Sequence, residues 1–244
     1  MGGPDRLALM KTMGVLGGIS PQATMDFEAR VHRISQRLVP PAFNAGYPPM
    51  VVWYHRRLPV CVGDDGRPIV PMRVDPQLVE AAGWLGKGVD FLVIPCNAAH
   101  IGLAEIRDAA GCPVLSMIDA ALEEVARRGW RRVGVLGFRM APTVYTEPLR
   151  QRGVVCETID GALQAPLDAG IQALTEGRER AADTEAARAA VAALRAARVD
   201  GVVLGCTEIP LLLGQDADAK DLMSPLALLA EAAVRHAIDD ASRV

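Results

Sequence analysis

The chain has 244 residues, a formal net charge of −3 and apolar side chains at 50% of its positions. It is long enough to bury a core without disulfides or metals, and its scattered Lys and Arg residues argue against nucleic-acid or anionic-membrane partners. No apolar run approaches the roughly 18 residues of a membrane helix, and the start from Met1 to Arg6 lacks an apolar signal core. Five cysteines are an odd number in such a chain, so we expect reduced thiols and a soluble cytoplasmic protein.

Short apolar runs alternate along the chain with longer Ala-, Leu- and Glu-rich stretches of helical period. This alternation is typical of βαβ units and predicts an α/β fold built on mostly parallel sheets. The predicted strands, in chain order, span residues 13–16, 50–54, 91–94, 114–116, 132–136, 154–157 and 201–204.

Between the strands, the segments differ in their expected structure. Residues 40–76 are rich in Pro and Gly and include one short strand, so we expect long loops, which are often functional. A helix is predicted over 118–128, ended by Gly129.

Two further helices are predicted near the end of the chain. One spans 183–198, where Asp183 or Thr184 is expected to cap the first turn. The other spans 225–238, has Pro225 in its first turn, and carries an apolar stripe made of Leu226, Leu229, Ala233 and Ala237.

Two segments of the chain are repeated. Residues 89–96 read VDFLVIPC and residues 199–206 read VDGVVLGC, so each copy ends in a cysteine. The GVLG of residues 14–17 recurs at 134–137. The chain therefore consists of two similar halves.

The repeat suggests two domains with a tight boundary, because no Pro- or Ser-rich linker separates the halves. We place an N-terminal α/β domain at residues 10–116 plus 222–244, with the last helix returning to the first half. The C-terminal α/β domain then spans residues 117–221.

Cys96 and Cys206 each follow a predicted buried strand. Ligands of open parallel sheets bind beyond the carboxyl ends of the strands, so two facing sheet ends would form a cleft with a sulfur on each wall. One thiolate can then remove a proton from one face of a carbon while the opposite thiol delivers another. A free thiol has a pKa of about 8.5, which backbone N–H groups at a helix N-terminus can lower.

Unpaired cysteines are also common core residues, and this alternative applies differently to each thiol. We assign packing roles to Cys112 and Cys156 and leave Cys61 open. The polar segments that follow Cys96 and Cys206 argue against a packing role for these two.

Cofactor and metal signals are weak. Cys96 and His100 are four residues apart, but a structural zinc needs more ligands, and the chain has no CxxC or HxxxH motif. His100 is expected to hydrogen-bond near the cleft or within its own helix.

The glycine turn at 17–21 can present N–H groups to a carboxylate or can be an ordinary tight turn. It lacks the later glycine of a dinucleotide fingerprint, and no P-loop is present, so we expect no cofactor and no metal.

The segments around the two cysteines resemble those of the Asp/Glu racemase superfamily, most closely its aspartate racemase branch. Residues 95–100, PCNAAH, are similar to that branch's PCNTAH segment, and residues 205–212, GCTEIPLL, match its corresponding segment throughout. Residues 14–21, GVLGGISP, are similar to its GVLGGMGP opening. The resemblance spans residues 13–237.

The resemblance implies a cofactor-independent racemase with two Rossmann-like three-layer αβα domains and parallel sheets. It further implies that the domains are related by pseudo-twofold symmetry, with the active site in the cleft between them, and that the protein is a homodimer. Cys96 and Cys206 would form the acid–base pair. Asn97 and Thr207 would orient the substrate, and Glu208 would lie near the second thiol.

The chain departs from the family where the substrate is expected to bind. Ala98 stands in place of a family threonine, and the family's PDR segment is not recognisable in residues 58–62. Arg56, Arg57 or Arg139 is therefore the candidate to bind a side-chain carboxylate. The predicted substrate-binding set comprises Gly18, Ser20, Arg56, Asn97, Ala98, Tyr145, Thr207 and Glu208.

The predicted function is racemisation or epimerisation of an acidic amino acid, aspartate or glutamate, or of a related altered substrate. Two alternatives remain. One is another enzyme of the superfamily, a maleate cis-trans isomerase or a decarboxylase, in which a cysteine acts as nucleophile or proton donor on a dicarboxylate. The other is a binding protein that keeps the fold without the chemistry.

Overall fold

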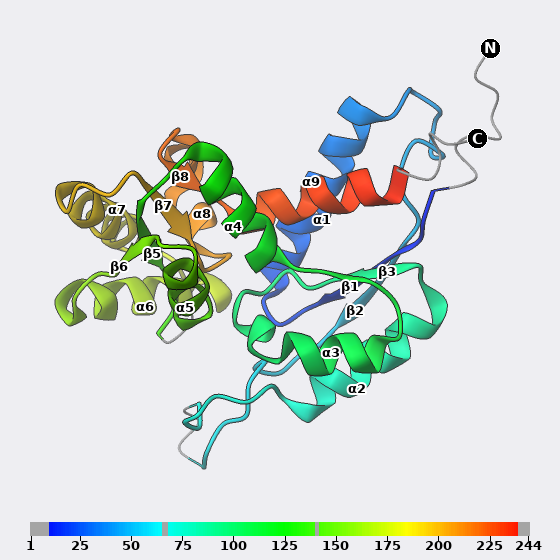
Figure 1. Ribbon diagram of the computed structural model, residues 1–244, viewed down its shortest axis with the longest axis horizontal. Coiled ribbons are helices and arrows are strands. Elements are labelled where there is room, and N and C mark those ends of the chain that lie inside the picture. The colour runs from blue at the N-terminus through cyan, green and yellow to red at the C-terminus, as the bar shows by residue number, and fades with distance from the viewer. Residues whose placement is uncertain (1–9, 65–67, 140–141, 239–244) are drawn as a thin grey trace. The chain divides into compact units, whose positions relative to one another are not determined.

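The computed structural model describes residues 10–64, 68–139 and 142–238 and contains two four-stranded parallel sheets (Figure 1). By its internal contacts the chain divides into two compact units. Of the described residues, unit 1 takes 10–116 and 226–238, and unit 2 takes Met117–Pro225 without the gap at 140–141. The predicted α/β class is confirmed. Residues 65–67 and 239–244, which the sequence assigns to the first domain, lie outside the described residues, as do residues 140–141 of the second.

Unit 1 is built on a parallel sheet whose strand order is β2-β1-β3-β4. The central strand, β1, is buried along its whole length. The strands are β1 (Met13–Gly17), β2 (Met50–Tyr54), β3 (Phe91–Val93) and β4 (Val114–Leu115). The helices are α1 (Pro21–Leu38), α2 (Pro76–Leu85), η2 (Gly86–Gly88), η3 (Ala98–Gly102), α3 (Leu103–Ala110) and α9 (Pro225–Ile238).

The last helix packs on the first sheet, as the sequence predicts. The four residues of the expected apolar stripe of α9 are at most 1% exposed. The Lys11 N–H donates to the Ala237 carbonyl at 3.0 Å, and the His236 ring lies edge-on to Phe91. Helix α9, red in Figure 1, lies beside α1, to which Arg37 and Glu231 link it by an ion pair of 3.3 Å.

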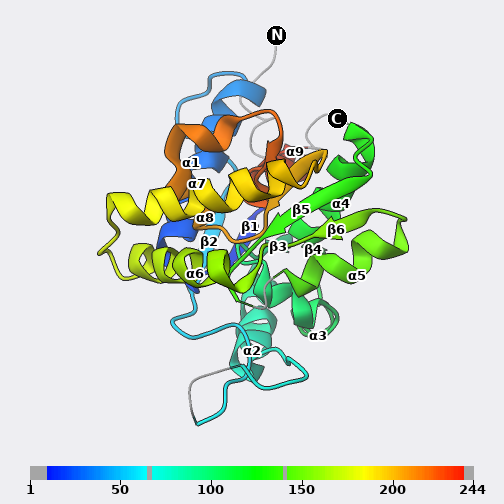
Figure 2. The same ribbon diagram turned by 90° about the vertical axis from the view of Figure 1, so that its left-hand side faces the viewer.

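Unit 2 repeats this topology with the strand order β6-β5-β7-β8. Its strands are β5 (Arg132–Leu136), β6 (Val155–Glu157), β7 (Gly201–Leu204) and β8 (Leu222–Met223). Its helices are α4 (Met117–Arg128), α5 (Thr143–Gln151), α6 (Gly161–Thr175), α7 (Ala181–Ala196), α8 (Ile209–Leu213) and η4 (Gly214–Asp218). Figure 2 shows α6 and α7 side by side, where their apolar faces share one core cluster.

Every predicted strand is present, with ends that agree to within a single residue. The short strand β8 was not predicted. It pairs with β7 in unit 2, and by its internal contacts the chain returns to unit 1 at Leu226. The domain boundary at residue 222 stays a prediction.

The predicted cap of the long helix in unit 2 is wrong. The helix α7 begins at Ala181, and Arg180 is its N-cap. Asp183 lies inside the first turn, where its carboxylate accepts the Arg180 N–H at 2.7 Å. The acidic residue therefore reaches back to the cap, as in a capping box, and does not itself begin the helix.

The sequence repeat has the same structural role in both units. Asp90 precedes β3 and its carboxylate accepts the Thr12 N–H, just before β1, at 2.6 Å. Asp200 precedes β7 and its carboxylate accepts the Arg132 N–H, at the start of β5, at 2.8 Å. Each aspartate also donates its own N–H to the residue that it binds. The two central strand pairs are thus fastened in the same way.

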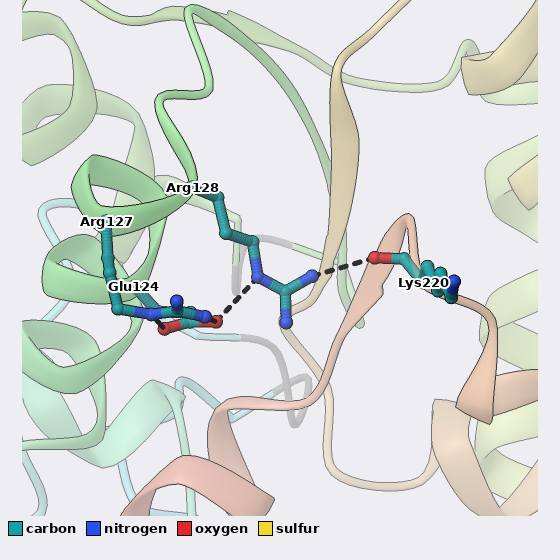
Figure 3. A network of polar contacts seen from close by, with 4 residues as sticks. All are labelled: Glu124, Arg127, Arg128 and Lys220. Carbon is teal, nitrogen blue, oxygen red and sulfur yellow. Dashed lines mark hydrogen bonds and ion pairs between the residues drawn. The ribbon is translucent and has the colours of Figure 1, made fainter.

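A charged cluster holds the end of α4 to the segment before β8 (Figure 3). Glu124 accepts hydrogen bonds from Arg127 at 2.6 and 2.7 Å and from Arg128 at 2.6 Å. Arg128 also donates to the Lys220 carbonyl at 2.8 Å and lies over the Trp130 ring. The Arg127 hydrogen bond, assisted by Arg128, lowers the pKa of Glu124 from 4.5 to about 2.

This cluster predicts a pH-dependent contribution to stability. Because the pKa of Glu124 is lowered in the folded state, its contribution is complete above pH 4.5 and is lost as the pH falls toward 2. We expect Glu124→Gln to lower the free energy of unfolding by about 1 kcal/mol near neutral pH. The difference from wild type should shrink between pH 4.5 and 2, as measured by urea unfolding.

Glu147→Gln is the matched control, because Glu147 makes a similar pair with Arg150 on an exposed helix surface. Exposed pairs contribute little, so this variant should unfold like wild type. An equal loss of stability in the two variants would contradict the role given to the α4 cluster.

Candidate functional site

The two candidate thiols occupy equivalent positions in the two units. Cys96 follows β3 and Cys206 follows β7, and each of these strands pairs with the central strand of its sheet. Both strands are buried along their whole length, whereas both cysteines are half-buried. Because ligands of parallel sheets bind beyond the carboxyl ends of the strands, both thiols lie where the fold offers a binding site.

The segment that carries Cys96 is fixed through its backbone. The Cys96 N–H donates to the Ile94 carbonyl at 2.8 Å, and Nδ1 of His100 lies 2.9 Å from the Cys96 carbonyl oxygen. His100 and Asn97 are both buried, and the His100 N–H donates to the Asn97 carbonyl at 3.1 Å. Ala98 begins η3 and is half-buried. His100 therefore lies next to Cys96 and binds its backbone.

The glycine turn after β1 lies against the end of β2. Gly18 has φ of +77°, and a Cβ at this position would lie 2.4 Å from Cα of Tyr54. The Gly18 N–H donates to the Thr24 hydroxyl at 2.8 Å, and the Ser20 hydroxyl caps α1 by accepting the Ala23 N–H. Both predicted site residues thus shape the turn, and their polar groups already have partners within unit 1.

The end of β2 carries the two neighbouring candidate arginines. The Arg56 guanidinium lies 4.6 Å from the centre of the Tyr54 ring. The Arg57 Nε lies 3.2 Å from the Asp75 carboxylate, to which Nε2 of the buried His55 also approaches within 3.4 Å. His55 and Asp75 were not among the predicted site residues.

The third candidate arginine lies in unit 2, after β5. The Arg139 N–H donates to Asp168 at 3.0 Å, and its guanidinium lies over the Phe138 ring. Its backbone has φ of +49°, in the left-handed region. The backbone of Arg139 is thus bound to α6, which carries Asp168.

A buried carboxylate lies beside the second thiol. The Cys206 thiol donates to Oε2 of Glu208 at 2.8 Å, and the Thr207 hydroxyl donates to the same oxygen at 3.1 Å. Glu208 and Thr207 are 5% and 6% exposed. A carboxylate that is both buried and in contact with a thiol can exchange a proton with it.

Tyr145 supports this segment from inside unit 2. Its side chain is fully buried, and a Cβ at Gly205 would lie 3.1 Å from its ring and 2.8 Å from the Leu136 carbonyl. Burial, followed by the charge of Cys206, raises the pKa of Tyr145 well above its ordinary value, so the phenol stays protonated. The absence of a side chain at Gly205 lets the Cys206 segment pack directly on this ring.

The described residues give few other signs of ligand chemistry. In the part of the chain that the structure describes, no group of three or more His, Cys, Asp and Glu side chains could hold a metal ion. None of the described helices is long and apolar enough to cross a membrane. None of the five cysteines, all of which lie in the described part of the chain, forms a disulfide.

Residues 16–237 match the family described as Asp/Glu/Hydantoin racemase. Among curated proteins, the broad specificity amino-acid racemase RacX of Bacillus subtilis is 29% identical over 150 residues. The match covers 61% of this chain and 60% of that protein, which is less than two thirds of the relative's length.

Two solved structures share the fold. An aspartate racemase homologue from Pyrococcus horikoshii OT3 has a TM-score of 0.70 at 24% identity, covering 96% of this chain and all of the other. The Picrophilus torridus aspartate racemase has a TM-score of 0.73 at 21% identity, covering 93% of this chain and 94% of the other. The resemblance predicted from the cysteine segments is confirmed, and the chain belongs to the Asp/Glu/Hydantoin racemase family.

Proposed function

We propose that the protein is a cofactor-independent amino-acid racemase in which Cys96 and Cys206 act as the acid–base pair. The observation that carries the proposal is the equivalent position of the two thiols, each beyond the carboxyl end of a buried strand next to the central one. Family membership and the amino-acid racemase activity in the name of the Bacillus subtilis relative support it.

In the proposed reaction a thiolate of one cysteine takes the proton from Cα of the amino acid. The electron pair of the broken C–H bond is delocalised into the substrate carboxylate. The thiol of the other cysteine then gives its proton to the opposite face of Cα, which inverts the configuration. The reverse reaction exchanges the two roles. This mechanism requires the two thiols to reach opposite faces of the same carbon.

Glu208 has a defined role in this scheme. The Cys206 thiol donates a hydrogen bond to the Glu208 carboxylate at 2.8 Å, so this carboxylate is placed to receive the thiol proton. When Cys206 acts as the base, its thiol proton rests on the Glu208 carboxylate. When Cys206 acts as the acid, the proton is already on sulfur. Asn97 and Thr207 are assigned to orient the substrate, as the family resemblance implies.

The substrate in this proposal is an amino acid, and two classes are open: an acidic amino acid, aspartate or glutamate, and a related altered substrate. We also propose that the protein is a homodimer and acts in the cytoplasm, where thiols stay reduced. Light scattering should then give about twice the chain mass of 26.0 kDa. If the protein racemises amino acids as a monomer, the proposed homodimer is wrong, whereas the proposed two-thiol chemistry is unaffected.

Serine substitutions test the roles of the two thiols. Cys96→Ser and Cys206→Ser should each reduce racemisation by at least about 100-fold, because each removes one of the two proton-transfer groups. The assay follows optical rotation with each pure enantiomer of a panel of amino acids. Cys112→Ser and Cys156→Ser are matched controls, since burial raises the pKa of both thiols and both should keep full turnover.

The single variants also distinguish the alternatives. A maleate-isomerase or decarboxylase type of enzyme should depend on one cysteine much more than on the other. Full turnover in both single variants would refute the two-thiol mechanism. A wild-type protein that binds amino acids without turnover would favour the binding-protein alternative.

A glutamine substitution tests the role of Glu208. Glu208→Gln keeps the size of the side chain and an oxygen for Thr207, but it cannot take the Cys206 proton, so kcat/KM should fall about 100-fold. The fall must be equal for both enantiomers, because they have the same free energy. Glu157→Gln is the matched control: it breaks the ion pair between Glu157 on β6 and Arg132 on β5 and should leave the rate unchanged.

The primary deuterium isotope effect at Cα gives a readout that a merely structural role of Glu208 would not move. It should rise in Glu208→Gln for the enantiomer that Cys206 deprotonates. An unchanged isotope effect and rate would contradict the role of this carboxylate.

A further inference from the structure

Two arginines, Arg56 and Arg57, follow the end of β2, and both are already engaged in contacts. The Arg57 Nε lies 3.2 Å from the Asp75 carboxylate. Arg56 lies over the ring of Tyr54, whose hydroxyl donates to Glu28 on α1 at 3.3 Å. Both arginines therefore lie in clusters that contain a carboxylate.

The Asp75 carboxylate is held firmly in place. It is the N-cap of α2, where its Oδ1 accepts the Gln77 N–H at 3.2 Å, and its own N–H donates to the Pro59 carbonyl at 2.9 Å. Asp75 is 8% exposed. The Arg57 guanidinium and the N-terminus of α2 both interact favourably with a negative charge at this position. The negative charge beside Arg57 is thus a fixed part of unit 1.

The third member of this cluster adds no charge. His55 is 5% exposed, and its Nε2 lies 3.4 Å from the Asp75 carboxylate. Burial lowers the pKa of His55 below 6.5, with Arg57 acting in the same direction and Asp75 in the opposite one. The imidazole is therefore neutral near pH 7, and the charges of Arg57 and Asp75 cancel.

The cluster of His55, Arg57 and Asp75 lies beside the segments expected to form the unit 1 side of the site. The His55 N–H donates to the Gly17 carbonyl at 2.8 Å, next to the glycine turn. Val74, the neighbour of Asp75, packs against Gly102, where a Cβ would lie 2.3 Å from that of Val74. Gly102 ends the η3 helix that follows Cys96, and Val74 and Cys96 pack on the same apolar cluster.

We propose that Asp75 neutralises Arg57 and thereby makes the site select amino acids with uncharged side chains over aspartate and glutamate. This inference rests on the proposed racemase function and specifies its substrate class. A substrate carboxylate that approached the remaining N–H groups of Arg57 would also meet the fixed charge of Asp75, so attraction and repulsion largely offset. Ala98, which supplies a methyl group after Cys96, matches the same substrate class.

The test compares substrate preferences in three proteins. The rate of Cα proton exchange in D₂O gives kcat/KM for L-alanine, L-serine and L-methionine, for L-aspartate and L-glutamate, and for L-lysine. Wild type should favour the uncharged set over the acidic set at least tenfold. Asp75→Asn keeps the cap on α2 and leaves Arg57 uncompensated, so the acidic-to-uncharged ratio should rise at least tenfold. Arg57→Gln leaves Asp75 uncompensated and should shift preference toward lysine.

A matched control separates charge at this cluster from ion-pair loss in general. Asp221→Asn breaks the bidentate pair with Arg195 at the amino end of the unit 2 sheet. It should leave all substrate ratios as in wild type. If Asp75→Asn acted only through the structure, it would lower kcat/KM for every substrate in parallel and leave the ratios unchanged. That result would overturn the proposal.

Two further outcomes would also overturn it. One is a wild-type enzyme that prefers aspartate or glutamate. The other is an acidic preference that Arg139→Gln abolishes and Asp75→Asn does not alter.

If wild type exchanges no amino acid at all, the racemase function fails, and calorimetric binding of the same panel tests the selectivity separately. The inference would be supported if wild type binds the uncharged amino acids more tightly than the acidic ones and Asp75→Asn reverses this order. Tighter binding of the acidic ones, or no binding of any, would overturn it.

Discussion

Parallel pairing to a buried central strand is the constraint on which the remaining structure depends. In each unit the strand that precedes a candidate thiol pairs with the central strand. At the start of each pair, the carboxylate of Asp90 or Asp200 accepts a backbone N–H at the start of the central strand. Since both strands of a parallel pair end at the same edge, the cysteine and the turn after the central strand come together there. The repeated sequence thus gives the same arrangement of strand, turn and cysteine in both units.

The two copies differ in the charges placed around this common plan. In unit 2 a buried carboxylate, that of Glu208, accepts a hydrogen bond from the Cys206 thiol. Unit 1 instead fixes the Cys96 segment through its backbone and places its carboxylate, Asp75, on an arginine at the end of β2. In the proposed mechanism the unit 2 carboxylate serves proton transfer, and the unit 1 carboxylate serves the choice of substrate.

The sequence predicted these features unequally, for physical reasons. Buried parallel strands are continuous apolar runs, which is why the strands and the cysteines at their ends were found. The strand β8 has only two residues, directly follows Lys220 and Asp221, and depends on pairing with β7, so no apolar run marks it. Asp75 before Pro76 is a recognisable cap signal. Its contact with Arg57 spans a loop and follows only from the tertiary fold.

The central claim is that two different groups serve the two faces of one carbon, and isotope transfer from a single enantiomer in D₂O tests it most directly. If Cys96 and Cys206 act as a pair, the first product molecules carry solvent deuterium at Cα while the unreacted substrate keeps its proton. Product that retains the substrate's own proton would show that one group acts on both faces and would contradict the account.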